Sequence, residues 1–275
     1  MKIINSIFII LLFAVCISCK KDKPEIQQPK PQTTVLKCAQ VFGLMINYNN
    51  YNTTKFTYNN DSQIVKVLSI GKDTSSWNAI FDLSYNAQNK LEKMQDLRKR
   101  AGHTIYFYNN AGLLSHTKYY GFDDKEEQFP TLQSINHLVY NADGRISDIE
   151  IHDNDDTLLA KNSLSYDAKG NMIKMEYFAY RNNKFEFVTM REFRYDDKVN
   201  PYYKITLPFN LAFNGPNNVT YSKIQLQNVN EINTTETNFN YTYNSNNLPE
   251  AVEIVVTDSR FGTGKGNAFY SYYCK

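Results

Sequence analysis

The chain has 275 residues, of which 42% are apolar, 14% aromatic and 21% charged, and 30 Lys and Arg against 28 Asp and Glu give a formal net charge of +2. This apolar content is sufficient for a folded core and excludes a disordered chain. The near balance of charge excludes a globally basic nucleic-acid-binding protein. The sequence contains 21 Tyr, 17 Phe and 33 Asn, an excess that favours strands and turns over helices.

The N-terminal segment, residues 1–18, has the features of a signal peptide. Lys2 precedes the unbroken apolar run Ile7–Ile17, which is shorter than the roughly 20 apolar residues that a membrane-spanning helix needs. Ser18 and Cys19 follow, and this pair resembles the lipobox of bacterial lipoproteins. The resemblance implies that Cys19 carries the lipid and becomes the mature N-terminus. The alternative is an ordinary cleaved signal peptide without a lipid.

Residues 19–34 are predicted to combine the lipidated Cys19 with an extended linker, because Pro24, Pro29 and Pro31 lie among polar residues. Several acyl chains give a stable membrane anchor, whereas one chain gives marginal binding. We therefore expect a lipid anchor in the bacterial cell envelope, at the outer membrane, with the face of that membrane left open. The linker is expected to hold a single β domain, residues 35–275, away from the membrane.

A short unit recurs from residue 56 onward: an apolar residue, any residue, Tyr, and then Asn or Asp. Residues two apart share one face of a strand, and Asn or Asp readily starts a turn. The residue four positions after the Tyr is Gly or Asn in most copies, and both tolerate the positive φ of a hairpin turn. Each unit therefore predicts a strand, a tight turn and a strand. The tyrosines of the unit are Tyr58, Tyr85, Tyr108, Tyr140, Tyr166, Tyr195 and Tyr243.

The series of units predicts an all-β fold, an antiparallel β-meander of consecutive hairpins with about 14–16 strands in one large twisted or curled sheet. Alternation with a period of two is clearest in Phe185–Tyr195, Ile149–Ile151 and Val252–Val256. The segments Val35–Tyr48 and Ala268–Cys274 are expected to add the first and last strands.

The unit resembles the YD (RHS-like) repeat, most clearly in Tyr140–Ile146 (YNADGRI) and Tyr166–Met172 (YDAKGNM). The chain as a whole resembles secreted bacterial lipoproteins that carry degenerate YD repeats. Asn200–Tyr203 (NPYY) and Asn217–Thr220 (NNVT) also resemble a recurring feature of those lipoproteins. The resemblance implies an extended or coiled β-sheet and implies no known reaction.

The search for chemistry predicts no catalytic residue, no cofactor and no metal site. No pair among His103, His116, His137 and His152 has the i, i+4 spacing of a helical metal site, although strands can bring two together. Asp153–Thr157 lacks the Gly and the Glu of a calcium loop and is interpreted as an acidic hairpin tip. Gly262–Gly266 lacks the residue order of a phosphate-binding loop and is interpreted as a hairpin connection.

Two kinds of covalent modification are suggested besides the lipid. Cys38 and Cys274 remain after Cys19, and an oxidising compartment permits a disulfide between them, the alternative being two separate thiols. Such a bridge would require the two Cα atoms to lie within about 7 Å. Asp156–Leu158 (DTL) resembles the acceptor that some Gram-negative bacteria use for O-glycosylation, with Thr157 as the acceptor residue.

These features predict a membrane-anchored envelope lipoprotein that acts as a non-enzymatic binding or scaffold module, with a glycan or protein partner and no nucleic acid. A glycan-active enzyme and a carrier that holds a lipid in the curled sheet are the alternatives. The repeat tyrosines either form an exposed binding face or pack along their own sheet, and the second interpretation is favoured.

Overall fold

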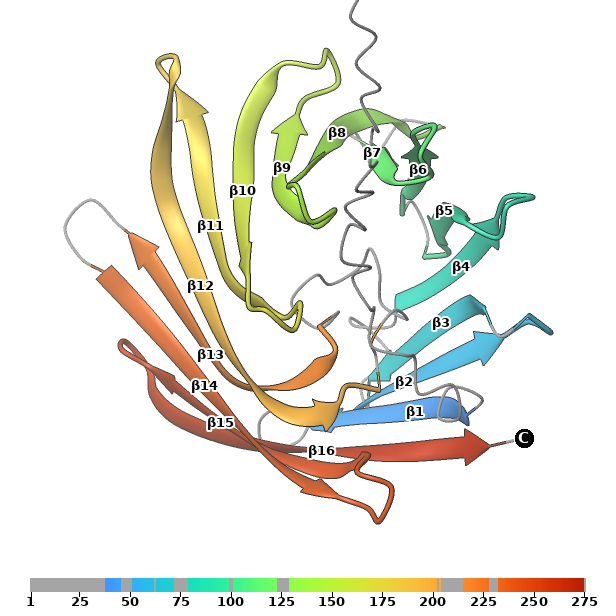
Figure 1. Cartoon of the computed structure of the whole chain (residues 1–275), viewed down its shortest axis with the longest axis vertical. Coiled ribbons are helices and arrows are strands. Elements are labelled where there is room, and N and C mark those ends of the chain that lie inside the picture. Colours follow the sequence, from blue (N-terminus) through green and yellow to red (C-terminus); the bar gives the residue numbers. More distant parts are fainter. Residues whose placement is uncertain are drawn as a thin grey trace, which may run out of the picture. The chain divides into compact units, whose positions relative to one another are not determined.

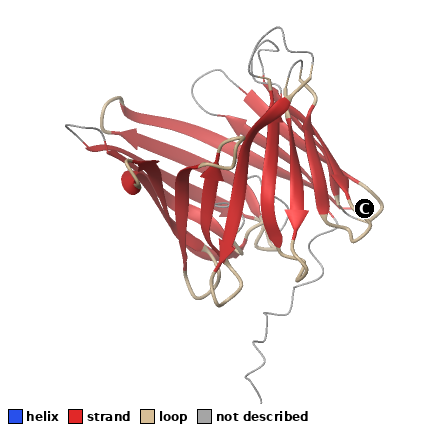
Figure 2. Ribbon diagram, turned by 90° about the horizontal axis from the view of Figure 1, so that it is seen from above, coloured by secondary structure: helices blue, strands red, loops and turns tan. Residues whose placement is uncertain are grey.

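A computed structural model describes residues 38–45, 51–61, 63–71, 79–98, 101–122, 129–201, 203, 215–227 and 232–274. Within these residues the chain forms one antiparallel sheet of sixteen strands and no helix (Figures 1 and 2). None of the described residues therefore forms a helix that could span a membrane. The predicted signal peptide, Cys19 and the linker lie outside the described residues.

The strands follow one another along the chain with short connections between most of them. They are β1 (Cys38–Met45), β2 (Tyr51–Tyr58), β3 (Ile64–Gly71), β4 (Ala79–Tyr85), β5 (Leu91–Asp96), β6 (His103–Tyr108), β7 (Leu114–Gly121), β8 (Thr131–Tyr140), β9 (Ile146–His152), β10 (Leu158–Tyr166), β11 (Met172–Arg181), β12 (Lys184–Val199), β13 (Asn217–Gln227), β14 (Ile232–Tyr243), β15 (Pro249–Asp258) and β16 (Gly262–Cys274).

Each strand is hydrogen-bonded to the strands before and after it in the sequence, as Figure 1 shows by the order of its colours. This arrangement confirms the predicted antiparallel meander. Strand β1 pairs with β2 on one side and with β16 on the other, so the order of neighbouring strands returns to its starting point. The register of β1 and β16 places Cys38 opposite Cys274. The disulfide between these two residues stays a prediction.

The turns that follow the repeat tyrosines have the predicted geometry. Tyr58, Tyr85, Tyr108, Tyr140, Tyr166 and Tyr243 each end a strand. In the turn after Tyr140, the amide nitrogen of Asn141 donates to the carbonyl oxygen of Arg145 at 2.8 Å, while Asn141 Oδ1 accepts from the amides of Asp143 and Arg145. The positive φ falls four residues after the Tyr, at Asn89, Gly112, Gly144, Gly170 and Asn247.

Two predictions about connections are wrong. Tyr195 does not end a strand, because β12 continues to Val199 through register shifts after Arg194 and after Tyr195. Gly262–Gly266 is not a hairpin connection but the first part of β16, since Gly264 lies opposite Val256 and Gly266 opposite Ile254 in the ladder with β15. Backbone pairing, which needs no side chain, keeps these glycines in the strand.

The core consists of three clusters spread along the sheet. One contains Leu164, Met172, Phe193 and Val219, a second contains Ile64, Leu83, Leu91 and Tyr106, and a third contains Val252, Ile254 and Ala268. Repeat tyrosines pack against the first two clusters. The buried face of the sheet is therefore the face that carries the repeat tyrosines, which we also call the corner tyrosines because most of them stand at a hairpin turn. The opposite face of the same strands remains available for function.

Candidate functional site

A single row of side chains crosses seven neighbouring strands, β6 to β12, at one level of the sheet. Each member is the ladder partner of the next, so all of them share one face. We call this set the cross-strand row; its members are Phe107, His116, His137, Glu150, Lys161, Phe178 and Phe187. Strands lie about 4.8 Å apart, so the row is about 29 Å long.

The part of the row on β10–β12 is an exposed aromatic cluster around one lysine. Lys161 Nζ lies 5.6 Å from the ring centre of Phe178 and 4.7 Å from that of Phe185. Phe178 meets Phe187 edge to face at 5.8 Å, and Tyr180 lies 5.1 Å from Phe185. Phe185 and Phe187 remain 38% and 37% exposed. A cation over aromatic rings is an attractive arrangement, and here it leaves ring faces available to a ligand.

The part of the row on β6–β9 contains two histidines, His116 and His137, and a third, His152, lies beside it. Phe107 and His116 stack with parallel rings 4.4 Å apart, and His116 lies 5.8 Å from the ring of His137. His137 in turn meets His152 edge to face at 4.7 Å. The sequence showed four histidines without helical spacing, and pairing of strands is what brings three of them together.

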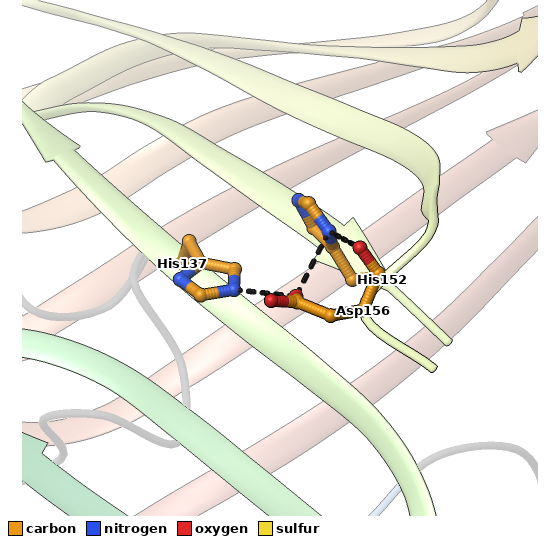
Figure 3. A group of neighbouring side chains, drawn as sticks. All are labelled: His137, His152 and Asp156. Atoms are coloured by element: carbon orange, nitrogen blue, oxygen red, sulfur yellow. Dashed lines mark hydrogen bonds and ion pairs between the residues drawn. The ribbon is translucent and has the colours of Figure 1, made fainter. Parts of the chain in front are cut away.

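Figure 3 shows His137, His152 and Asp156 pointing toward one another from β8, β9 and the turn before β10. Asp156 Oδ1 lies 2.9 Å from His137 Nε2 and 3.1 Å from His152 Nδ1. The same Nδ1 lies 2.9 Å from the carbonyl oxygen of Asp156, and His152 Nε2 lies 3.8 Å from Glu150 Oε2. The imidazoles thus meet a carboxylate that is more than half exposed, with a second carboxylate behind His152.

The electrostatics of this cluster follow from these contacts. The hydrogen bond with His137 is the main cause of a lowered pKa of the Asp156 carboxyl, and the electrostatic interactions with His137, His152 and Lys118 act in the same direction. Burial lowers the pKa of His116, and the neighbouring His137 and Lys118 lower it further. The cluster therefore favours an ionised Asp156 beside a neutral His116.

The segment Asp153–Thr157 confirms the predicted acidic hairpin tip. Asp153 Oδ1 accepts from the amides of Asp155 and Thr157, and the amide of Asp153 donates to the carbonyl oxygen of Thr157. This is the geometry of the tyrosine-led turns, with His152 in the place of the Tyr and Asp156 at the positive φ of 62°. The spacing His-Asp-x-x-Asp was thus a usable signal that sequence reasoning missed. Thr157, the predicted O-glycosylation residue, is exposed in this turn.

The repeat tyrosines have a structural role, because most of their hydroxyl groups form hydrogen bonds between neighbouring hairpins. Four of their hydroxyls donate to the carbonyl oxygen that begins the second strand of the preceding unit: Tyr85 to Ile64, Tyr108 to Leu91, Tyr140 to Leu114 and Tyr195 to Met172, at 2.6–2.9 Å. Tyr272 does the same to Pro249 at 2.8 Å. The Tyr243 hydroxyl donates to Asp196 instead, and the buried Tyr58 hydroxyl has no hydrogen-bond partner among the described residues. Sequence reasoning missed Tyr272 as a member of the series because Tyr273 follows it where the unit has Asn or Asp.

From the two segments singled out in the sequence, Asn200, Asn217 and Asn218 take part in a buried polar network. Asn218 donates to both carboxylate oxygens of Asp196, to which the Tyr243 hydroxyl also donates. The side chain of Asn200 donates to the carbonyl oxygen of Gly215 at 2.8 Å. Asn171, fully buried, bonds to Asn217 through two hydrogen bonds. This network joins β11, β12 and β13 where Tyr195 does not form a tight turn.

A separate open cavity of about 400 Å³ lies near the opposite ends of β4–β7. Its lining includes Phe81, Met94, Asp96, Arg98, His103 and Tyr119. Burial raises the pKa of the Asp96 carboxyl, but its hydrogen bonds with Arg98 and the charge of that guanidinium together outweigh burial and lower the pKa. The carboxylate in this cavity is thus held as an ion pair.

No protein-family model matches the chain, and no curated protein matches it in sequence. Among solved structures, the fold is similar to a porin-like protein from Bacteroides uniformis, with a TM-score of 0.58 and 11% identity over 86% of this chain and 97% of that one. A porin-like protein from Bacteroides vulgatus gives a TM-score of 0.47 and 13% identity over 80% and 93% of the two chains.

The Tc holotoxin pore of Photorhabdus luminescens gives a TM-score of 0.31 and 9% identity over 77% of this chain and 12% of that chain. The similarity to the Bacteroides uniformis protein shows a shared all-β fold. The resemblance to lipoproteins with YD repeats stays a prediction from sequence.

Proposed function

We propose that the protein is a lipid-anchored, non-enzymatic binding module of the bacterial cell envelope that binds a glycan along the cross-strand row. The anchor at Cys19 rests on the predicted signal peptide and the lipobox-like Ser18-Cys19, and the outer-membrane location is proposed together with it. The single observation that carries the binding function is the unbroken row of aromatic and polar side chains across seven strands.

The composition of the row supports a glycan as the ligand. A sugar ring presents C–H groups on its faces, which pack on exposed aromatic rings such as Phe187 in the row and Phe185 next to it. Its edge presents hydroxyls, which bond to polar groups such as Lys161 and Glu150. A linear glycan would lie across the strands and meet one row member after another. Nucleic acid is a poorer match, because Glu150 offsets Lys161 and the chain as a whole has a formal charge of only +2.

Binding is tested with a glycan array followed by titration of the full chain in detergent with the best ligand. Phe187→Ala removes an exposed ring of the row and should lower the affinity about 5- to 30-fold, the loss expected for one aromatic contact worth about 1–2 kcal/mol. Phe269→Ala removes a ring that is 58% exposed on β16, outside the row, and should leave the affinity unchanged.

The other functions give different outcomes in the same experiment. Cleavage of the bound glycan would support the glycan-active enzyme, and a co-purifying lipid found by native mass spectrometry would support the lipid carrier. Equal affinities of the two phenylalanine variants, or no glycan bound by the unmodified chain, would contradict the proposal. Metabolic labelling with an alkyne fatty acid, compared with a Cys19→Ser variant, tests the anchor independently.

A further inference from the structure

We propose that His137, His152 and Asp156 form a zinc site at the middle of the cross-strand row. One ligand atom from each of these residues lies within 4.8 Å of the other two. Two imidazole nitrogens and one carboxylate oxygen form a donor set that suits zinc and leaves a fourth position for water or a ligand. This inference departs from the sequence analysis, which predicted no metal, and it does not depend on glycan binding.

The distances in the cluster are close to those that a zinc ion would require. Tetrahedral bonds of about 2.1 Å separate neighbouring ligand atoms by about 3.4 Å. Asp156 Oδ1 now lies 2.9 Å from His137 Nε2 and 3.1 Å from His152 Nδ1. An ion would therefore need the carboxylate oxygen to move a few tenths of an ångström away from each nitrogen, and the two nitrogens, which lie within 4.8 Å of each other, to settle at the tetrahedral spacing. It would replace the contacts of Asp156 Oδ1 with both rings and the hydrogen bond of His152 Nδ1 to the carbonyl oxygen of Asp156. The 56% exposure of the Asp156 side chain gives the ion access from solvent.

A buried nitrogen supplies a second and independent observation. Among the described residues, His152 Nε2 is one of two buried side-chain polar atoms that have no hydrogen-bond partner. Coordination through Nδ1 needs the lone pair on that nitrogen and moves the ring proton to Nε2. The proton then faces Glu150 Oε2, now 3.8 Å away. A metal-bound histidine that donates its other N–H to a carboxylate is the common arrangement in zinc sites.

The backbone of Asp156 supplies a third observation. Its φ is 62°, and the corresponding position of the five tyrosine-led turns is always Gly or Asn, namely Gly112, Gly144, Gly170, Asn89 and Asn247. Aspartate tolerates this conformation less readily than Gly. The turn therefore carries a less favourable residue, whose carboxylate is the group that meets both histidines. Local strain of this kind is concentrated at functional sites.

Zinc binding is tested by titrating the full chain in detergent, without a histidine tag and with its thiols blocked, with Zn²⁺ alone in a calorimeter. Co²⁺ serves as a spectroscopic probe of tetrahedral coordination. We expect one zinc per chain and a cobalt spectrum typical of a tetrahedral site. Glu150→Gln should lower the zinc affinity about 10–100-fold, as for other carboxylates behind a metal-bound histidine, and Asp156→Gly should lower it more.

Asp156→Gly separates metal binding from folding, because Gly is the residue that the same turn has elsewhere. In the absence of zinc, this variant should unfold at the same temperature as the unmodified chain or at a higher one. The matched control is His103→Gln, since His103 stacks on Tyr120 outside the cluster, and it should keep the full affinity. An unmodified chain that binds no zinc, or equal zinc affinity in Asp156→Gly and His103→Gln, would overturn the proposal.

Discussion

The hydroxyl groups of the corner tyrosines explain why the repeated unit contains Tyr and not another aromatic residue. The Tyr108 ring packs on the core, while its hydroxyl donates to the carbonyl oxygen of Leu91 in the preceding hairpin at 2.8 Å. Tyr85 makes the same pair of contacts, with the carbonyl oxygen of Ile64 as its acceptor. The ring supplies buried area and the hydroxyl supplies a bond that crosses from one unit to the next. A phenylalanine would supply only the first of these contributions.

Tyr108→Phe is therefore expected to lower the free energy of unfolding by about 0.5–1.5 kcal/mol, the usual net value of one hydrogen bond. Urea unfolding followed by circular dichroism measures the change. Tyr119→Phe is the control, because Tyr119 is 42% exposed and is not a corner tyrosine; it should change the free energy by less than about 0.5 kcal/mol. Equal effects of both substitutions would argue against a structural role for the corner hydroxyl.

At the scale of the hairpin, the turn depends on an Asn or Asp at its start and a residue with positive φ three positions later. Gly144 has a φ of 74°, and a Cβ atom placed on it would meet no other atom within 4 Å. Any loss of stability caused by a side chain at this position thus comes from the backbone conformation alone. The same conformation is adopted by Asn89 and Asn247, which tolerate it better than other L-residues do.

Gly144→Ala should therefore destabilise the protein by about 1–2 kcal/mol, the cost of the left-handed conformation for an ordinary residue. Gly144→Asn should cost less, since Asn holds this position in other turns of the chain. Thermal unfolding of both variants measures the difference. If alanine and asparagine were tolerated equally, the positive φ would not be the property selected at this position.

At the scale of the whole molecule, the corner tyrosines make the free energy of unfolding depend on pH in the alkaline range. Burial raises the pKa of Tyr58 and of Tyr166 to about 12 in the folded chain, whereas an exposed tyrosine titrates near 10. Above about pH 10 the unfolded chain therefore loses these protons before the folded chain does. The stabilisation is complete below that pH and decreases as the pH rises toward 12.

We expect the urea midpoint to fall between about pH 10 and about pH 12, with tyrosinate absorbance rising together with loss of the β-sheet signal. Tyrosinate absorbance measured without urea provides the control, because buried tyrosines should ionise at a higher pH than exposed ones. Ionisation of all tyrosines near pH 10 in a chain that remains folded would contradict this explanation.

The first and last strands are neighbours, and this pairing makes the predicted disulfide testable. Residues directly opposite in an antiparallel pair have Cα atoms about 4.5–5.5 Å apart, within the range of disulfides, and Cys38 and Cys274 are such a pair. Mass spectrometry of the unreduced chain should find them linked. Cys38→Ser should lower the free energy of unfolding by about 4–5 kcal/mol, because the bridge would close a very long loop.

Reduction of a Cys38→Ser, Cys274→Ser double variant is the matched control and should cause no further loss of stability. Alkylation of both thiols in the unreduced chain would show that no bridge forms.

The sequence by itself determined the strands, the antiparallel order and the turn geometry, because these depend on local alternation and on residues four positions apart in each turn. Tyr140–Ile146 shows this: its turn residue, its positive φ and its next strand are all readable from seven letters. The prediction of a tight turn after Tyr195 is wrong, because contacts of Asn217 and Asn218 with residues distant in the sequence replace that turn.

Only the tertiary structure decided the cross-strand row and the cluster of His137, His152 and Asp156. The row members come from seven strands, and His137 lies on β8 whereas His152 and Asp156 lie at the turn between β9 and β10. Their meeting therefore depends on the register of each pair of strands. A shift of one residue in any pair would turn a row member to the other face of the sheet. Register results from the sum of turns, bulges and core contacts along the chain, so the local spacing of His152 and Asp156 indicates one part of the cluster but neither His137 nor the row.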